Sequence, residues 1–513
     1  MLFRIIAICG LLVWLIPYAH ALAPVPKQSA IDAKTIESYQ KIGAIYGVIK
    51  TQDDGYMEFV ESKPGTNTNS EGFPAFQIPK DTGKNSAIVF PEVDVPFGIK
   101  VDDSYPADFF KELAGLKNLT ILIVTSISSI GNSFSELEHA QQLTALRICH
   151  TGVTDTILKT VGKIKTLIRL EFGVSKEVTQ EGWKQLAGLT ELRSFITNYS
   201  SLGDKEMKML GQFSKLVKLK IFSHSISDEG AMELAGLKEL EWLVLESTLI
   251  RDAGLKVLRN FDKLTRLTLN GMMLTDEGLK EMKGLVNLEE LGLESTRVTD
   301  IGIRELAGLK KLKFLFLGRT FVTGVGLRHL EGLTWLTLNS TLVTDVGIKE
   351  LENLNQLAVL NLYTTAITDV ALKSITKIRR LRELDLSYTL VSDVGLRDIH
   401  KLVGLEKLNL SCTSVTDAGI RDLTGLPKLS SLQLRSTRVT DLGMKQIHSI
   451  SKLNDLDLAC SAVSNTGLKE LHSVKSLKRI TLEDSQTTPT GIAEMLKAIP
   501  SCEVNSFVMP KFR

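Results

Sequence analysis

The chain has 513 residues, of which 61 are Lys or Arg and 59 are Asp or Glu. A chain of this length usually folds into several domains, unless it is a repeat array. The near balance of charge gives no argument for attraction to nucleic acid, anionic lipid or a polyanionic substrate. We therefore predict no nucleic-acid partner.

The first residues have the composition of an export signal. Arg4 precedes an apolar run from Ile5 to Ile16, and small residues in A-x-A spacing follow. Cleavage after Ala21 is favoured, since cleavage after Ala23 would leave Pro24 at the first mature position. The alternative is an uncleaved anchor, although the apolar run is shorter than the about 20 residues that span a bilayer. We expect a signal peptide at residues 1–21, no later membrane span, and a secreted or periplasmic location.

Residues 22–105 are predicted to form an N-terminal cap. Residues 31–50 have the pattern of one helix and one strand, which would cover the apolar edge of the first repeat. Residues 61–87 are rich in Gly, Pro, Asn, Ser and Thr, and this predicts a mobile loop. An enzyme with its active site in residues 24–105 is an alternative, which the short and loop-rich segment disfavours.

Most of the remaining chain repeats the unit TDxGLxxLxxLxxLxxLxLxxT every 24 residues. In one copy, Leu291 and Leu293 alternate with polar or small residues, so both should point inward from a strand. Thr299 and Asp300 carry side-chain oxygens that would cap the free amides of the following helix. Each copy is thus a strand and a short helix, which cannot bury its apolar side without neighbours.

We predict sixteen strand cores, and one irregular copy among them. The cores begin at Leu119, Leu143, Leu167, Leu192, Leu216, Leu240, Leu264, Leu288, Leu312, Leu333, Leu357, Leu381, Leu405, Leu429, Leu453 and Leu477. Between Gly324 and Asp345 the spacing falls to 21 residues. The missing residues belong to the turn between helix and strand, so the sheet should continue while the outer layer becomes thinner. The solenoid is assigned to residues 106–500, and residues 501–513 to a tail with one last strand.

The LxxLxL strand followed by a short helix resembles the leucine-rich repeat family. The resemblance implies an α/β solenoid, a leucine-rich repeat horseshoe with a parallel inner sheet, short outer helices and about 16 repeats. The TDxGL variant is similar to exported proteins of planctomycete-type bacteria and to the repeat part of F-box substrate receptors. The first likeness implies an exported protein-binding scaffold. The second implies a ubiquitin-ligase subunit for SCF-dependent degradation, which the export signal and the missing F-box-like segment oppose.

Neither a catalytic motif nor a cofactor motif stands out. The sequence has no HExxH, GxSxG, GxGxxG or P-loop lysine pattern. His400, His448 and His472 share one repeat position, but neighbouring helices lie about 8 to 10 Å apart and no third ligand is evident. We predict a non-enzymatic protein with no metal and no cofactor.

Aromatic residues gather at the exposed positions of the inner sheet. Phe314 and Phe316 lie two apart on one strand, and Trp335 takes the matching position on the next. Large rigid rings on such a surface concentrate binding energy. The predicted partner site comprises Phe314, Phe316 and Trp335, with Trp242, Tyr363 and Tyr388 as outlying members. The alternative is that the rings lie flat on the sheet and cover each other. The expected partner is a protein, with a glycan as the alternative.

Charged residues at the same positions follow an order along the chain. The early ones are Arg147, Arg169, Glu171, Lys218 and Lys220, and the late ones are Glu383, Asp385, Asp455 and Asp457. We interpret them as a solvated face rather than a docking surface for an oppositely charged partner.

Overall fold

The structure is a computed structural model that describes residues 30–62, 72–79, 89–102, 107–125, 131–149, 152–175 and 177–506. The expected signal peptide at residues 1–21 lies outside these ranges. The chain divides into two compact units, Met1–Ser225 and Ile226–Arg513, so the boundary falls among the repeats. Among the residues described, no helix has the length and apolar character needed to cross a membrane.

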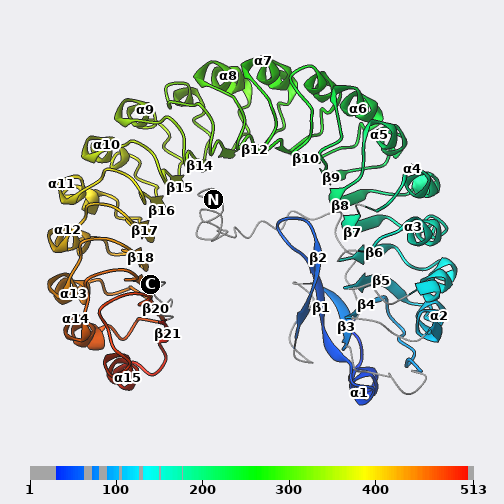
Figure 1. The fold of residues 1–513 in the computed structure, drawn as a ribbon, viewed down its shortest axis with the longest axis horizontal. Coiled ribbons are helices and arrows are strands. Elements are labelled where there is room, and N and C mark those ends of the chain that lie inside the picture. Colours follow the sequence, from blue (N-terminus) through cyan, green and yellow to red (C-terminus); the bar gives the residue numbers. More distant parts are fainter. Residues whose placement is uncertain are drawn as a thin grey trace, which may run out of the picture. The chain divides into compact units, whose positions relative to one another are not determined.

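The described residues of the first unit form five α-helices and nine strands, drawn from blue to green in Figure 1. The helices are α1 (Ala33–Lys41), α2 (Ala107–Gly115), α3 (Asp155–Val161), α4 (Gln180–Lys184) and α5 (Asp204–Leu210), with a 3-10 helix at Gly131–His139. The strands are β1 (Ile45–Thr51), β2 (Met57–Glu61), β3 (Phe73–Ile78), β4 (Phe97–Val101), β5 (Leu119–Val124), β6 (Ala145–Ile148), β7 (Arg169–Ser175), β8 (Ser194–Ser200) and β9 (Lys218–Phe222). From β3 onward each strand pairs in parallel with the next.

The N-terminal segment contains more structure than the sequence predicts. The expected helix and strand within residues 31–50 are present as α1 and β1. Part of the expected loop at residues 61–87 is wrong, because residues 73–78 form β3, which pairs with both β1 and β4. The reason is packing that the local composition does not reveal: Phe76 is fully buried, and its ring stacks on Tyr39 with centroids 3.9 Å apart.

The second unit repeats one strand and one short helical segment, drawn from green to red in Figure 1. Its strands are β10 (Trp242–Glu246), β11 (Arg266–Thr268), β12 (Glu290–Gly292), β13 (Phe314–Phe316), β14 (Trp335–Thr337), β15 (Val359–Asn361), β16 (Glu383–Asp385), β17 (Lys407–Asn409), β18 (Ser431–Gln433), β19 (Asp455–Asp457), β20 (Arg479–Thr481) and β21 (Glu503–Asn505). Its helices are α6 (Asp228–Met232), α7 (Asp276–Leu279), α8 (Asp300–Glu305), α9 (Asp345–Lys349), α10 (Asp369–Ile375), α11 (Asp393–Leu396), α12 (Asp417–Leu423), α13 (Asp441–Ile447), α14 (Asn465–Glu470) and α15 (Pro489–Ala498).

The repeat from Leu288 to Lys311 shows which positions of a repeat form the core. Leu291, Leu293, Ile303 and Leu306 are all fully buried, as the period of two in the strand and the one-sided helix predict. The sixteen predicted strands are present as β5 to β20, and the last strand-like piece is β21. The α/β solenoid of leucine-rich repeats, with parallel strands on one side and short helices on the other, is therefore confirmed as the fold class.

The Asp of the TDxG motif links neighbouring repeats, which corrects its predicted role. Thr299 does cap α8, because its side chain accepts from the Ile301 amide at 3.2 Å. Asp300 instead accepts from Thr323 in the next repeat, through the Thr323 amide and its hydroxyl, the latter at 2.6 Å. Stacking places each carboxylate beside the following cap, a contact that the pattern of a single repeat cannot show.

The Gly of the motif makes room for that carboxylate. A Cβ on Gly302 would lie 2.5 Å from Asp276 Oδ1, and one on Gly419 would lie 2.5 Å from Asp393 Oδ1. Ala371 holds this position in one repeat, where the Thr368 amide still donates to Asp345 Oδ1 at 2.8 Å. The three recurring letters of TDxG thus serve one contact between successive repeats.

The shortened repeat has a reduced outer layer, as predicted. Its helical segment is a three-residue 3-10 helix, Leu327–His329, whereas β13 and β14 on either side pair in register. Gly324 replaces the Asp, has φ +101°, and approaches Gly347 so closely that an added Cβ would lie 2.8 Å from the Gly347 Cα. A shallow pocket lined by Leu309, Leu312 and His329, among others, marks the thinner outer side.

Candidate functional site

The strand face of the second unit is the surface of its parallel sheet that points away from the helices. Its side chains come from the first and third residues of each paired strand triplet, and the middle residue points into the core. On β13 these are Phe314 and Phe316, both half-buried, on either side of the fully buried Leu315. The parallel register aligns Phe314 with Trp335 and Phe316 with Thr337.

The structure thus brings the three main predicted residues, Phe314, Phe316 and Trp335, to adjoining positions of two paired strands. We call them the aromatic cluster. Trp335 is also half-buried. Partial exposure of three adjacent aromatic side chains provides apolar area that a partner can cover at low cost in side-chain entropy.

The three outlying residues lie elsewhere. Trp242 is on β10, where the guanidinium of Arg266 lies over its ring at 4.8 Å. Arg266 also pairs with Glu290 at 3.6 Å, so Trp242 belongs to a charged row rather than to the aromatic cluster. Tyr363 and Tyr388 form their own edge-to-face pair, with centroids 5.3 Å apart. Tyr388 has φ 56° and is 54% exposed, on the turn after β16.

Two polar atoms beside the aromatic cluster have no hydrogen-bond partner among the described residues. They are Trp335 Nε1 and Thr337 Oγ1, both enclosed, and Thr337 as a whole is only 9% exposed. A buried donor without an acceptor costs about 1–3 kcal/mol. A ligand that offers acceptor oxygens here would remove that cost.

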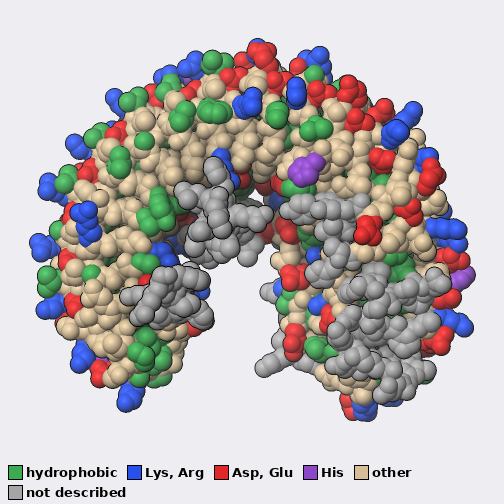
Figure 2. Space-filling model, viewed as in Figure 1, with side chains coloured by type: hydrophobic (Ala, Val, Ile, Leu, Met, Phe, Trp, Pro, Cys, Tyr) green, Lys and Arg blue, Asp and Glu red, His purple; other side chains and the backbone are tan. Residues whose placement is uncertain are grey.

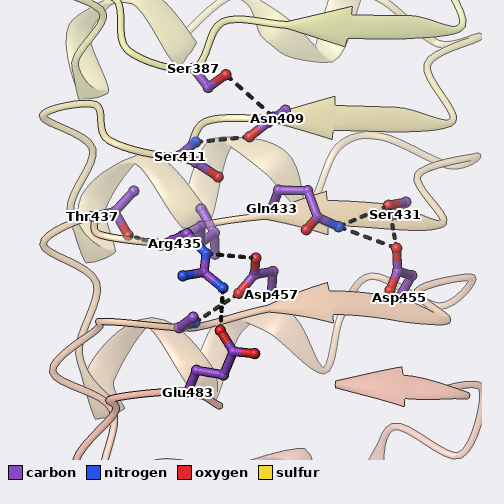
Figure 3. A network of polar contacts seen from close by, with 12 residues as sticks. Ser387, Asn409, Ser411, Ser431, Gln433, Arg435, Thr437, Asp455, Asp457 and Glu483 are labelled. Carbon is purple, nitrogen blue, oxygen red and sulfur yellow. Dashed lines mark hydrogen bonds and ion pairs between the residues drawn. The ribbon is translucent and has the colours of Figure 1, made fainter. Parts of the chain in front are cut away.

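The late acidic residues are mostly engaged in contacts within the sheet. Figure 3 shows Arg435 between Asp457 and Glu483, with nitrogen–oxygen distances of 3.4 Å and 2.7 Å. Asp455 accepts from Ser431 at 2.9 Å and pairs with Arg479 at 2.9 Å. This part of the predicted charge series is a polar network rather than a set of freely solvated carboxylates.

Two carboxylates differ from this pattern. No Lys or Arg in the described residues forms an ion pair with Glu294 or Asp385. Burial raises the pKa of the Glu294 carboxyl above its usual range, with Arg319 opposing this effect and Glu246 adding to it. Burial also raises the pKa of Asp385, which hydrogen bonds from Ser387 partly offset.

The early basic residues do not form an exposed face, which corrects the interpretation of a solvated surface there. The β1–β2 hairpin lies on the strand face of the first unit. Arg169 donates to Thr51 Oγ1 at 2.9 Å and to the Gly55 carbonyl at 2.5 Å, and Glu171 Oε2 accepts from the Met57 amide at 3.0 Å. Glu171 is fully buried and pairs with Arg169.

Further contacts complete this arrangement. Tyr56, at the tip of the hairpin, makes two cation–π contacts. The Arg147 guanidinium lies 4.8 Å from its ring centroid and the Lys220 ammonium lies 5.0 Å from it. Ile49 and Met57 pack in one apolar cluster with Ile123 of β5. The β1–β2 hairpin therefore covers part of the strand face of the first unit. The sequence signals were the β-branched and aromatic residues within 45–51 and the alternation of Met57 and Phe59 with Glu58.

Exposed apolar side chains also recur outside the strand face of the second unit. One series follows the strand turn in five repeats, and another takes the x position of TDxG. Together they include Leu249, Met273, Phe321, Leu342, Leu390, Ile301, Val346, Val370, Val394 and Leu442. Figure 2 shows hydrophobic patches spread over the visible face of this unit. The described residues contain no group of three or more His, Cys, Asp or Glu side chains placed to hold a metal ion.

Comparisons with known proteins agree with the fold. A family model described as Leucine Rich repeat matches residues 214–235, and no curated protein matches the chain. A leucine-rich repeat protein of Leptospira interrogans is similar at 21% identity, with a TM-score of 0.51 over 79% of this chain and 99% of that one. The TLR13–ssRNA13 complex is similar at 18% identity, with a TM-score of 0.50 over 79% of this chain and 66% of that one.

An internalin of Listeria monocytogenes is 22% identical over 60% of this chain and 84% of that one, with a TM-score of 0.47. The two likenesses with the higher TM-scores concern the fold alone. Together with the recurring motif and the stacked parallel strands, they agree with a leucine-rich repeat fold.

Proposed function

We propose that the chain is an exported, non-enzymatic scaffold that binds a protein partner through the strand face of its second unit. The observation that carries this proposal is the aromatic cluster, in which Phe314, Phe316 and Trp335 stand half-buried on paired strands. In the first unit, by contrast, the chain's own hairpin occupies part of the strand face.

A protein is favoured over nucleic acid as the partner. The structure of TLR13 is that of a complex with ssRNA13. In the second unit, Glu294 and Asp385 place carboxylates on either side of the aromatic cluster, and no Lys or Arg of the described residues forms an ion pair with them. Such charges oppose a phosphate backbone, which needs Lys and Arg. Aromatic side chains on a rigid sheet favour a partner with apolar anchor residues.

Export is part of the proposal and rests on residues 1–21 and their apolar run. Fractionation of cells that express a C-terminally tagged chain tests it. We expect the tagged chain outside the cytoplasm and shorter by the signal peptide. Retention in the cytoplasm at full length would contradict export and favour the ubiquitin-ligase alternative.

Capture of partners tests the binding surface. Proteins from the extracellular fraction of the source organism would be passed over the immobilised chain and over two double variants. Phe316→Ser with Trp335→Ser removes the aromatic cluster, whereas Phe321→Ser with Leu342→Ser removes exposed apolar side chains elsewhere in the same repeats. We expect a partner that is lost with the first variant and kept with the second.

Two other results would contradict the proposal. A partner retained by both variants, or lost only with Phe321→Ser and Leu342→Ser, would place binding away from the aromatic cluster. Periodate oxidation of the extracellular fraction destroys glycans. If this treatment abolishes capture, the ligand is a glycan rather than a protein surface.

A further inference from the structure

We propose that the segment received by the aromatic cluster is a cationic peptide stretch of the partner, with Lys or Arg side chains flanking an apolar anchor. This inference rests on the proposed function and specifies the chemistry of its partner. It follows from the charges of the strand face, the two carboxylates that flank the cluster, and the enclosed donors between them.

The strand face of the second unit is acidic although the chain as a whole is not. Three positions are relevant for each strand from β10 to β20: the first and third residues of the paired triplet, and the residue two after the third. These positions hold eight carboxylates and four cations. The carboxylates are Glu246, Glu290, Glu294, Glu383, Asp385, Asp455, Asp457 and Glu483, and the cations are Arg266, Lys407, Arg435 and Arg479. Over the whole chain, Lys and Arg exceed Asp and Glu by 61 to 59.

Each of the four cations already has a carboxylate partner. Arg266 pairs with Glu290 at 3.6 Å, Lys407 with Glu383 at 2.8 Å, and Arg479 with Asp455 at 2.9 Å. Arg435 pairs with both Asp457 and Glu483. The surplus negative charge therefore includes Glu294 and Asp385, for which the described residues supply no ion pair.

These two carboxylates lie on either side of the aromatic cluster. Glu294 follows β12, whose Gly292 pairs with Phe316 of β13. On the other side the register runs from Phe316 through Thr337 and Asn361 to Asp385. With strands about 4.8 Å apart, Asp385 stands about 14 Å from Phe316, and Glu294 about one strand away on the opposite side. An extended peptide of about six residues covers this span.

The charge of Asp385 is more than its local turn requires. Asp385 Oδ1 accepts from the Ser387 amide at 2.9 Å and from the Ser387 hydroxyl at 2.5 Å. Asn361 and Asn409, at the same position of the neighbouring strands, accept from the amide two residues on at 2.9 Å and 3.0 Å with a neutral side chain. An uncharged side chain thus satisfies the same turn amide, so the turn amide alone does not require the negative charge of Asp385.

A peptide also fits the two enclosed donors. Trp335 Nε1 and Thr337 Oγ1 lie between Glu294 and Asp385 in strand order and have no acceptor among the described residues. Backbone carbonyls of a peptide are acceptors, and its cationic side chains would offset the negative charge of the two carboxylates, whose pKa values are raised by burial. Cations also bind the faces of aromatic rings.

A peptide library tests the inference. Random 12-residue peptides displayed on phage would be selected on the full-length chain after depletion on the Phe316→Ser, Trp335→Ser variant. We expect the surviving peptides to be enriched in Lys and Arg around an aromatic or aliphatic residue. Surviving peptides without this enrichment would overturn the cationic inference and leave the proposed site intact. Failure to obtain any peptide that distinguishes the two proteins would contradict the proposed site itself.

Charge-removing variants provide the second arm. One selected peptide, labelled with a fluorophore, would be titrated with the Glu294→Gln, Asp385→Asn variant and with Asp262→Asn, Glu331→Gln, which removes two exposed carboxylates away from the strand face. We expect a loss of affinity of about tenfold or more in the first case and less than about twofold in the second. Equal affinities for all three proteins, measured by anisotropy at low salt, would overturn the inference.

Discussion

Asp276 and Thr299 lie 23 residues apart in the chain and are joined by two hydrogen bonds. Asp276 Oδ1 accepts from the Thr299 amide at 2.8 Å, and Oδ2 accepts from the Thr299 hydroxyl at 2.7 Å. The same pair recurs from repeat to repeat, for example between Asp417 and Thr440. Successive repeats are therefore joined by hydrogen bonds at their helix caps as well as by apolar contacts in their core.

Loss of this contact should destabilise the solenoid. Asp276→Ala leaves the Thr299 amide and hydroxyl without their acceptor, and we expect a loss of about 1–3 kcal/mol in the free energy of unfolding. Thr299→Ala should lose about 1 kcal/mol through the cap. Thr344→Ala is the control. The preceding repeat has Gly324 in place of the Asp that would accept from Thr344, and the Thr344 side chain makes no cap hydrogen bond. Urea denaturation measures all three, and equal losses for Thr299→Ala and Thr344→Ala would contradict the role of the Asp.

A methyl group added at the motif glycine should also be costly. Gly302→Ala places Cβ 2.5 Å from Asp276 Oδ1, so we expect a loss of about 1–3 kcal/mol in unfolding free energy. Gly308→Ala provides the comparison, because nothing lies within 4 Å of its added Cβ. Thermal unfolding of the two variants should separate them. An unchanged melting temperature for Gly302→Ala would mean that the repeats shift apart easily, as the repeat with Ala371 allows.

Neighbouring residues on β13 should have opposite consequences. Leu315 is fully buried, so Leu315→Ala should cost about 2–5 kcal/mol in stability. Phe316 is half-buried on the strand face, so Phe316→Ser should cost less in stability and more in partner binding. Circular dichroism melts together with binding assays would show the difference. A fold lost in Phe316→Ser but kept in Leu315→Ala would contradict the assigned faces.

The hairpin of the first unit should depend on one buried carboxylate. Glu171→Ala removes the acceptor of the Met57 amide and leaves Arg169 without its charge partner, which typically costs about 3–5 kcal/mol. We expect faster amide hydrogen exchange in residues 45–61, followed by mass spectrometry. Glu181→Ala is the control, since this side chain is 74% exposed and forms a surface ion pair with Lys184. Unchanged protection of the hairpin in Glu171→Ala would contradict the assigned anchor.

Stability should respond to pH at Asp385. Because burial raises its pKa above the ordinary value of 3.8, ionisation is less favourable in the folded than in the unfolded chain. The stability that this group contributes is present below the ordinary pKa and is lost as pH rises through the folded pKa. Asp385→Asn should therefore raise the melting temperature at pH 7, and the gain should fade toward pH 3.5. A gain that persists at pH 3.5, or a lower melting temperature at pH 7, would contradict the assigned burial effect.

Features that depend on local periodicity could be predicted from the sequence. The alternation around Leu291 and Leu315 indicates a strand in any copy, and sixteen copies in succession leave only stacking as a way to bury them. The neighbours Phe314 and Trp335 could be aligned because parallel strands of equal repeats keep one register. The role of Asp300 could not be read in this way, because its partner is in the next repeat.

Contacts between segments far apart in sequence were decided only by the tertiary structure. Met57 and Glu171 are 114 residues apart, and no repeat pattern connects them. Their contact determines that part of the first strand face is covered, just as Arg266 over Trp242 separates that ring from the aromatic cluster. The sequence by itself determined the solenoid, because burial of regularly spaced leucines needs only neighbouring repeats. Which parts of its strand face are covered, and which of the described carboxylates form an ion pair, depends on side chains brought together by the fold.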